Sequence, residues 1–157
     1  MRQYAGELEG AGLKVAIVVS RFNRAVTEAL LEGAHQGLLA SGVASDDICV
    51  FGVPGAFEIT LATERCASSR RFDAVVCLGA VVRGETPHFD FLASEVSRGV
   101  GDVSMRHSCP VGFGVLTTDT MEQALARSGQ GHGNKGFEAA QTAVEMARLL
   151  RLIPTAP

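Results

Sequence analysis

Long apolar runs alternate along the chain with segments whose apolar residues are spaced like one face of a helix. Two runs, 14–20 (KVAIVVS) and 73–82 (DAVVCLGAVV), are continuous and rich in β-branched residues, which is typical of strands covered on both faces. Shorter runs at 47–53 and 111–117 predict two more strands. Apolar residues at three- to four-residue spacing predict helices over 24–41, 57–69, 89–105, 121–128 and 137–152.

Three of these helices have clear apolar faces that should point inward. In the first helix Val26, Leu30, Ala34 and Leu38 lie four residues apart, and Gly42 follows as a natural stop. The predicted inner residues of the second and third helices are Ile59, Ala62, Cys66 and Ala67, and Phe89, Leu92, Val96 and Val100.

Strands that alternate with helices at this spacing imply right-handed βαβ crossovers and a parallel sheet with helices on both faces. We therefore expect an α/β protein, a flavodoxin-like three-layer α/β/α sandwich whose four-stranded parallel sheet has the order 2-1-3-4. Residues 1–12 form a polar N-terminal arm that could add an edge strand to this sheet or to a neighbour's. A chain of 157 residues leaves no room for a second domain, so 1–157 should be one domain.

Composition excludes several classes of partner. A net charge of −3, a single Tyr and no Trp argue against nucleic acid. No apolar run approaches the roughly 20 residues that span a bilayer, and no signal-peptide pattern is present, so we expect a cytoplasmic protein without a membrane partner. Cys49, Cys66, Cys77 and Cys109 show no zinc-type spacing, and we expect buried, reduced thiols.

Polar or aromatic residues follow all four predicted strands, at 20–23 (SRFN), 54–58 (PGAFE), 83–90 (RGETPHFD) and 117–119 (TTD). Ligands of open parallel sheets bind at the carboxyl ends of the strands. In the third stretch Gly84 lets backbone amides approach a ligand, Thr86 adds a hydroxyl, and His88 can exchange a proton near neutral pH. This combination suits an anion beside a proton-transfer step. The same stretch could equally be a plain helix start, with Thr86 as N-cap and Pro87 as the first helical residue.

Other candidates also have two interpretations. Phe22 could stack on a flat heterocycle or pack against the next helix. Glu58 could accept hydrogen bonds from ligand hydroxyls or complement a helix dipole. Arg127 and Lys135 could bind phosphate or be solvated surface charges.

The order of the elements places some candidates far from His88. Phe113 lies early on the fourth strand, and Arg127 and Lys135 follow a helix that runs back from its carboxyl end, so none should reach His88 within one subunit. A site that uses all of them must lie between subunits. A metal centre is not expected, because the His88-x-Asp90 pattern has no second His nearby.

Six motifs together resemble the 6,7-dimethyl-8-ribityllumazine synthase family. They occur in order over most of the chain: SRFN at 20–23, VPGAFE at 53–58, LG at 78–79 with RGETPHFD at 83–90, FG at 113–114 with LTTD at 116–119, EQA at 122–124, and GNKG at 133–136. The resemblance implies the penultimate step of riboflavin biosynthesis. In it, 5-amino-6-(D-ribitylamino)uracil condenses with 3,4-dihydroxy-2-butanone 4-phosphate to the lumazine, and phosphate and water are released without a cofactor.

The resemblance also implies residue roles. His88 is the expected proton-transfer residue, and Phe22 the ring that stacks on the pyrimidine. Substrate contacts are expected from Asn23, Ala56, Phe57, Val81 and Val82, with Glu58 on the ribityl hydroxyls and Gly84, Glu85 and Thr86 at the phosphate. Phe113, Arg127, Lys135 and Glu138 would come from the neighbouring subunit.

Assembly is implied as well. The family forms pentamers, and the short loop at 129–136 resembles that of members whose pentamers build an icosahedral 60-mer shell, with riboflavin synthase as a possible partner enzyme. Two alternatives remain open: a related pentameric riboflavin synthase, against which Thr86 and Arg127 argue, and a non-catalytic shell-forming or flavin-binding paralogue.

Overall fold

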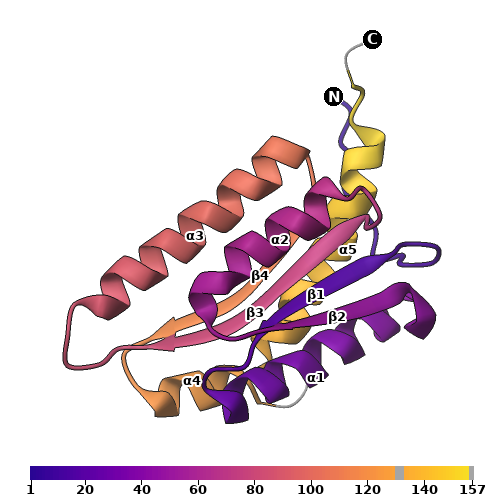
Figure 1. Ribbon diagram of the computed structural model, residues 1–157. Coiled ribbons are helices and arrows are strands. Elements are labelled where there is room, and N and C mark those ends of the chain that lie inside the picture. The colour runs from indigo at the N-terminus through magenta and orange to yellow at the C-terminus, as the bar shows by residue number, and fades with distance from the viewer. Residues whose placement is uncertain (130–132, 156–157) are drawn as a thin grey trace.

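The computed structural model describes residues 1–129 and 133–155, and it places a four-stranded sheet between two layers of helices (Figure 1). Gln130, Gly131 and His132, which belong to the loop used for the shell prediction, lie outside the described residues. No helix within the described ranges is both long and apolar enough to cross a membrane.

The strands and helices lie close to their predicted positions. The strands are β1 (Val15–Ser20), β2 (Ile48–Val53), β3 (Ala74–Val82) and β4 (Val111–Thr118). The helices are α1 (Arg24–Ala40), α2 (Ile59–Ser68), α3 (His88–His107), α4 (Met121–Arg127) and α5 (Lys135–Leu152), with short 3₁₀ turns η1 (Ser45–Asp47) and η2 (Ala56–Glu58).

All strand pairs in the sheet are parallel, and the order β2-β1-β3-β4 confirms the predicted three-layer α/β fold. Ser20 pairs with Val53, and Val82 pairs with Thr118. All four strands therefore end at the same edge of the sheet, which is where the polar stretches were expected to meet.

Alternate residues of the two central strands supply two separate cores. Val15, Ile17 and Val19 of β1 face α1 and α5, whereas Ala16 and Val18 face α2 and α3. Figure 1 shows α2 and α3 over one face and α1, α4 and α5 over the other. The continuous apolar runs of β1 and β3 follow from this double cover, since both faces of each strand exclude water.

The inner faces of the helices match the predictions with one exception. Val26, Leu30, Ala34 and Leu38 of α1 are fully buried, and Val96 and Val100 of α3 are buried as well. On α2, Ala62 is only half-buried and Thr63 takes the inner position. Thr63 can be buried because its hydroxyl donates to the Ile59 carbonyl at 2.8 Å and lies 3.1 Å from Sγ of Cys77.

The N-terminal arm adds no strand to the sheet of its own chain, so that part of the expectation is wrong for this sheet. Instead it runs beside α5, where Nη2 of Arg148 donates to the Ala11 carbonyl at 2.7 Å. Gly6 approaches the Glu145 backbone so closely that a Cβ would stand 1.9 Å from its carbonyl oxygen. The arm therefore packs against α5 of its own chain.

Strand β2 is less covered than predicted. Cys49, Val50 and Phe51 are exposed on this edge strand, so the expectation that all four thiols are buried fails at Cys49. The other three cysteines are buried and free, as expected. An edge strand has only one neighbour, and here α2 covers little of its outer part.

Candidate active site

A cavity of about 270 Å³ opens at the carboxyl edge of the sheet, between the β1–α1 turn and the β3–α3 loop. Its lining combines aromatic, small apolar and polar side chains from segments far apart in the sequence. The lining residues are Phe22, Asn23, Ala56, Ala80, Val81, Val82, Gly84, Thr86, His88, Phe89 and Leu92. The structure therefore brings together eight of the residues expected to bind substrate or transfer a proton.

The β1–α1 turn presents Phe22 to this cavity. The next residue, Asn23, has left-handed backbone angles (φ 59°, ψ 54°), which Asn tolerates better than most residues. Its side-chain amide donates to the Ala80 carbonyl of β3 at 2.8 Å, and its own carbonyl accepts from Val26 and Thr27. Asn23 thus fixes the turn, while Phe22 stays 69% exposed, and its ring is free to meet a planar ligand.

The β3–α3 loop supplies the polar side of the cavity. Gly84 has open space around it, and Thr86 and His88 are exposed toward the lining. Within the described residues, no hydrogen bond engages the Thr86 hydroxyl or the His88 imidazole. His88 is the first residue of α3, a helix of 20 residues whose amino end favours an anion.

The alternative in which Thr86 caps this helix is wrong in its detail. Pro87 occupies the N-cap position, and no side chain caps α3 there. The hydroxyl of Thr86 and the first amides of the helix are consequently available to a ligand.

The β2–α2 turn contributes less than expected. Buried Ala56 lines the cavity, but Phe57 points away to a hollow between α2 and α3, and Glu58 is exposed outside the lining. Glu85 also lies outside it. None of the described residues holds the carboxylate of Glu58 by a hydrogen bond or ion pair, so it could still turn toward a larger ligand.

The four residues expected from a neighbour do not line this cavity. Phe113 lies on β4 beside α3, and the Arg127 guanidinium donates to the Gln123 carbonyl at 3.1 Å within α4. Lys135 and Glu138 pair with each other at 2.6 Å on α5. In a single chain these groups are exposed and separate from His88.

Three lining residues had no predicted functional role: Ala80, Phe89 and Leu92. Phe89 and Leu92 had been expected only to face the core, and they do pack against it while also closing the cavity. The helical spacing of Phe89 and Leu92 indicated the face of the helix on which they lie, but nothing in the sequence distinguished Ala80 from other apolar strand residues.

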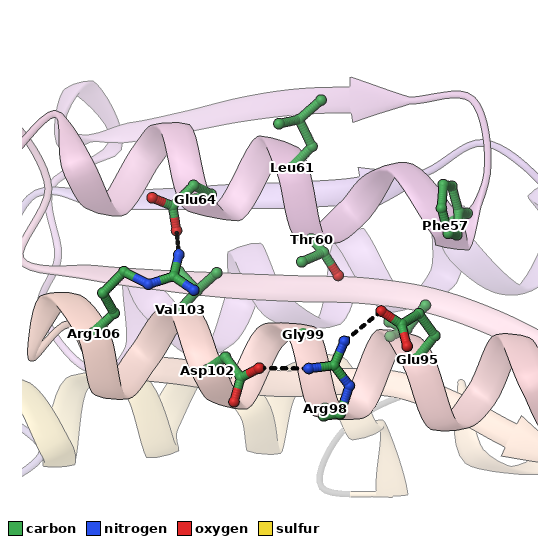
Figure 2. A pocket seen from close by; sticks show the side chains of 11 residues that line it. Phe57, Thr60, Leu61, Glu64, Glu95, Arg98, Gly99, Asp102, Val103 and Arg106 are labelled. Carbon is green, nitrogen blue, oxygen red and sulfur yellow. Dashed lines mark hydrogen bonds and ion pairs between the residues drawn. The ribbon is translucent and has the colours of Figure 1, made fainter.

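A larger hollow of about 390 Å³ lies between α2 and α3, away from the strand ends (Figure 2). Its charged side chains already satisfy one another. Arg98 bridges Glu95 and Asp102, and Arg106 pairs with Glu64. Figure 2 shows the pairs of Arg98 along α3 and the pair of Arg106 with Glu64 between α3 and α2, so each charged side chain of this hollow has a partner.

Neither the buried thiols of Cys77 and Cys109 nor the acidic groups of the described residues form a second reactive or metal-binding site. Burial raises the pKa of the Cys77 thiol to about 12 and that of the Cys109 thiol to about 11, so both stay protonated and unreactive at neutral pH. Over residues 1–129 and 133–155, no three His, Cys, Asp or Glu side chains gather in a way that could hold a metal ion.

Comparison with known families agrees with this geometry. A family model described as 6,7-dimethyl-8-ribityllumazine synthase matches residues 12–151 of the 157-residue chain. The matched span runs from before β1 into α5 and includes every residue of the cavity. The chain therefore belongs to the 6,7-dimethyl-8-ribityllumazine synthase family, and this membership implies a transferase of riboflavin biosynthesis that makes lumazine.

Proposed function

We propose that this protein condenses 5-amino-6-(D-ribitylamino)uracil with 3,4-dihydroxy-2-butanone 4-phosphate to 6,7-dimethyl-8-ribityllumazine, with release of phosphate and water. One observation carries the proposal: Phe22, Thr86 and His88 line the same cavity at the carboxyl edge of the sheet. A stacking ring, an anion site and a proton carrier are the three elements that this condensation needs.

The pyrimidine would lie against Phe22, with backbone groups of Val81 and Val82 at its edge. Both valines end β3 and line the cavity beside Ala56, so their peptide groups are held in a fixed place. Asn23 keeps the Phe22 turn in register with β3 through its hydrogen bond to Ala80. Glu58, just outside the lining, would bind the ribityl hydroxyls, and Phe57 would flank them.

The phosphate of the second substrate would bind at the amino end of α3. The open space at Gly84, the free Thr86 hydroxyl and the positive end of the helix dipole all favour an anion there, and the backbone of Glu85 would add to this site. His88, in the same first turn, would move the protons that amine attack, phosphate elimination and dehydration require. The imine forms between the two substrates, so no protein lysine is needed as a nucleophile.

Much of the acceleration would come from holding two reactive molecules in contact, since orientation alone can contribute several kcal/mol, about 7–11 in the best cases. Among the described residues, no Lys or Arg lines the cavity to neutralise the phosphate. Arg127 of an adjacent subunit would supply that charge, with Phe113, Lys135 and Glu138 closing the pocket. A pentamer, which could build a 60-mer shell and enclose riboflavin synthase, fits this arrangement, with 1–157 acting as a single domain in the cytoplasm.

The proposal is tested by the rate at which the purified protein forms lumazine from the two substrates, followed by absorbance. We expect a rate well above that of the uncatalysed reaction, because positioning and proton transfer both act in the cavity. A rate equal to the uncatalysed background would show that this chain does not perform the reaction.

A further inference from the structure

Arg83 lies between the end of β3 and the proposed anion site, yet its guanidinium faces carboxylates of the same chain. Nε donates to Oδ1 of Asp119 at 2.8 Å, and Nη1 lies 3.3 Å from Oδ1 of Asp90. Its Cζ stands 4.4 Å from the centre of the Phe89 ring. Arg83 therefore connects the end of β4 with the first turn of α3. We call these contacts the Arg83 clamp.

The Asp119 end of the clamp is firmly held. The backbone amide of Asp119 donates to Oε1 of Gln123 at 2.9 Å, and Thr120 and Gln123 form a capping box at the start of α4. The backbone amide of Arg83 also donates to the Thr118 carbonyl at 2.8 Å. The backbone of Arg83 and the backbone of its partner Asp119 are therefore both held by hydrogen bonds.

The other end of the clamp carries the groups of the cavity. Phe89 and Asp90 immediately follow His88. Among the described residues, no side-chain hydrogen bond ties residues 84–88 to the rest of the protein. The Arg83 contacts to Phe89 and Asp90 are the polar and cation–π links that hold this turn against the sheet edge, next to the apolar packing of Phe89 and Leu92.

Arg83 is a poor candidate for the phosphate ligand itself. Its charge is offset by two carboxylates, so the clamp presents no net positive charge to an anion. The hydrogen bond to Asp119, the largest effect, raises the pKa of the Arg83 guanidinium, so the group stays charged and paired.

We propose that Arg83 is a positioning residue of the catalytic site. By holding the first turn of α3 against Asp119, it sets where His88 and the amides of the anion site stand in the cavity. This inference rests on the proposed function, because it assigns Arg83 to the lumazine-forming site.

The expected size of the effect on rate and on folding stability distinguishes a positioning role from a role in stability. The Arg83 side chain is 45% exposed, and exposed ion pairs each contribute roughly 0–1 kcal/mol to folding. A displacement of about 1 Å at a reacting group can instead cost up to about 100-fold in rate. Removing the clamp should consequently slow turnover while the protein stays folded.

The test compares Arg83→Gln and Arg83→Lys with a matched control, Arg151→Gln. Arg151 also joins a helix to a strand end, through Asp73 at 3.0 Å, but at the opposite edge of the sheet. We expect Arg83→Gln to lower kcat about tenfold with KM changed less than about threefold, and Arg83→Lys to recover part of the loss. Arg151→Gln should keep wild-type kinetics.

Hydrogen–deuterium exchange of the peptide covering 84–92 supplies a readout that does not depend on activity. It should speed up in Arg83→Gln and stay unchanged in Arg151→Gln. Unchanged exchange in Arg83→Gln would overturn the clamp, and so would faster exchange with unchanged kcat. A main effect on KM for the phosphorylated substrate would instead make Arg83 a phosphate ligand. Absence of turnover in the wild type would refute the proposed function. Hydrogen–deuterium exchange of residues 84–92 would then still test whether Arg83 holds this segment.

Discussion

His88 and Arg127 lie in different parts of the chain and should have different effects when removed. His88→Ala is expected to lower kcat by about tenfold or more, because proton transfer is lost while the anion site remains. Arg127→Ala is expected to raise KM for the phosphorylated substrate about 10- to 100-fold, the usual worth of a hydrogen bond to a charged group. Steady-state kinetics of both variants measure the two parameters separately. Equal effects on kcat and KM in both variants would contradict these roles.

Some residues of the site could be predicted because one rule places them together. Phe22, Thr86 and His88 each follow a strand, and parallel strands end at a common edge. The contact of Asn23 with the Ala80 carbonyl could not be predicted, since it joins residues 57 positions apart and depends on a left-handed turn. The partners of Arg83 could not be predicted either, because the sequence does not indicate which carboxylate a surface arginine will pair with.

The burial of single side chains was harder to predict than the site. Thr63 is buried through its hydrogen bond to its own helix, which a hydrophobicity pattern counts as a polar position. Cys49 is exposed because β2 forms the edge of the sheet, and edge position depends on strand order rather than on the composition of the strand.

At the level of helices and strands, the apolar periods predicted every strand and α-helix within about two residues. The remaining errors are at helix ends, where capping decides. Helix α5 begins at Lys135 rather than 137 because Asn134 caps it, accepting from the Gly136 amide at 2.8 Å and the Phe137 amide at 3.2 Å. The N-terminal arm also differs from expectation, because its partial alternation could indicate either a strand or an irregular segment.

Asn134 also joins α1, the residue after α4 and the start of α5. Substituting it therefore tests how strongly these helices are held together. The residue is only 3% exposed, and its side-chain amide donates to the carbonyls of Ala29 at 2.9 Å and Ser128 at 3.1 Å. Asn134→Ala would remove the hydrogen bonds that Asn134 makes with α1, with the residue after α4 and with the first turn of α5. We expect a loss of about 2–4 kcal/mol in the free energy of unfolding.

A suitable control is Thr120→Ala, which removes the cap of α4 at an exposed position. This variant should lose only about 1 kcal/mol. Chemical denaturation of the two variants beside the wild type compares them directly. An Asn134→Ala protein as stable as Thr120→Ala would mean that the buried hydrogen bonds contribute little.

For the whole molecule, the main consequence of the proposed function is that each chain would carry two half-sites. The cavity with Phe22 and His88 opens at the sheet edge, whereas Phe113, Arg127 and Lys135 are exposed elsewhere and do not line it. A repeated head-to-tail contact between identical chains forms a ring when its rotation closes, and in such a ring each chain can offer one half to each neighbour. Such an assembly would make the oligomer a condition of activity.

The sharing of each catalytic site between two subunits is tested most directly by mixing His88→Ala and Arg127→Ala subunits in one assembly. Equal co-expression, with a sedimentation mass to verify the assembly, would give every combination of neighbours. Rates are measured at a phosphorylated-substrate concentration where each variant alone is nearly inactive. About a quarter of the sites should combine an intact His88 with an intact Arg127, so the mixture should recover about a quarter of the wild-type rate. A mixed assembly no faster than the average of its two parents would contradict a site shared between subunits.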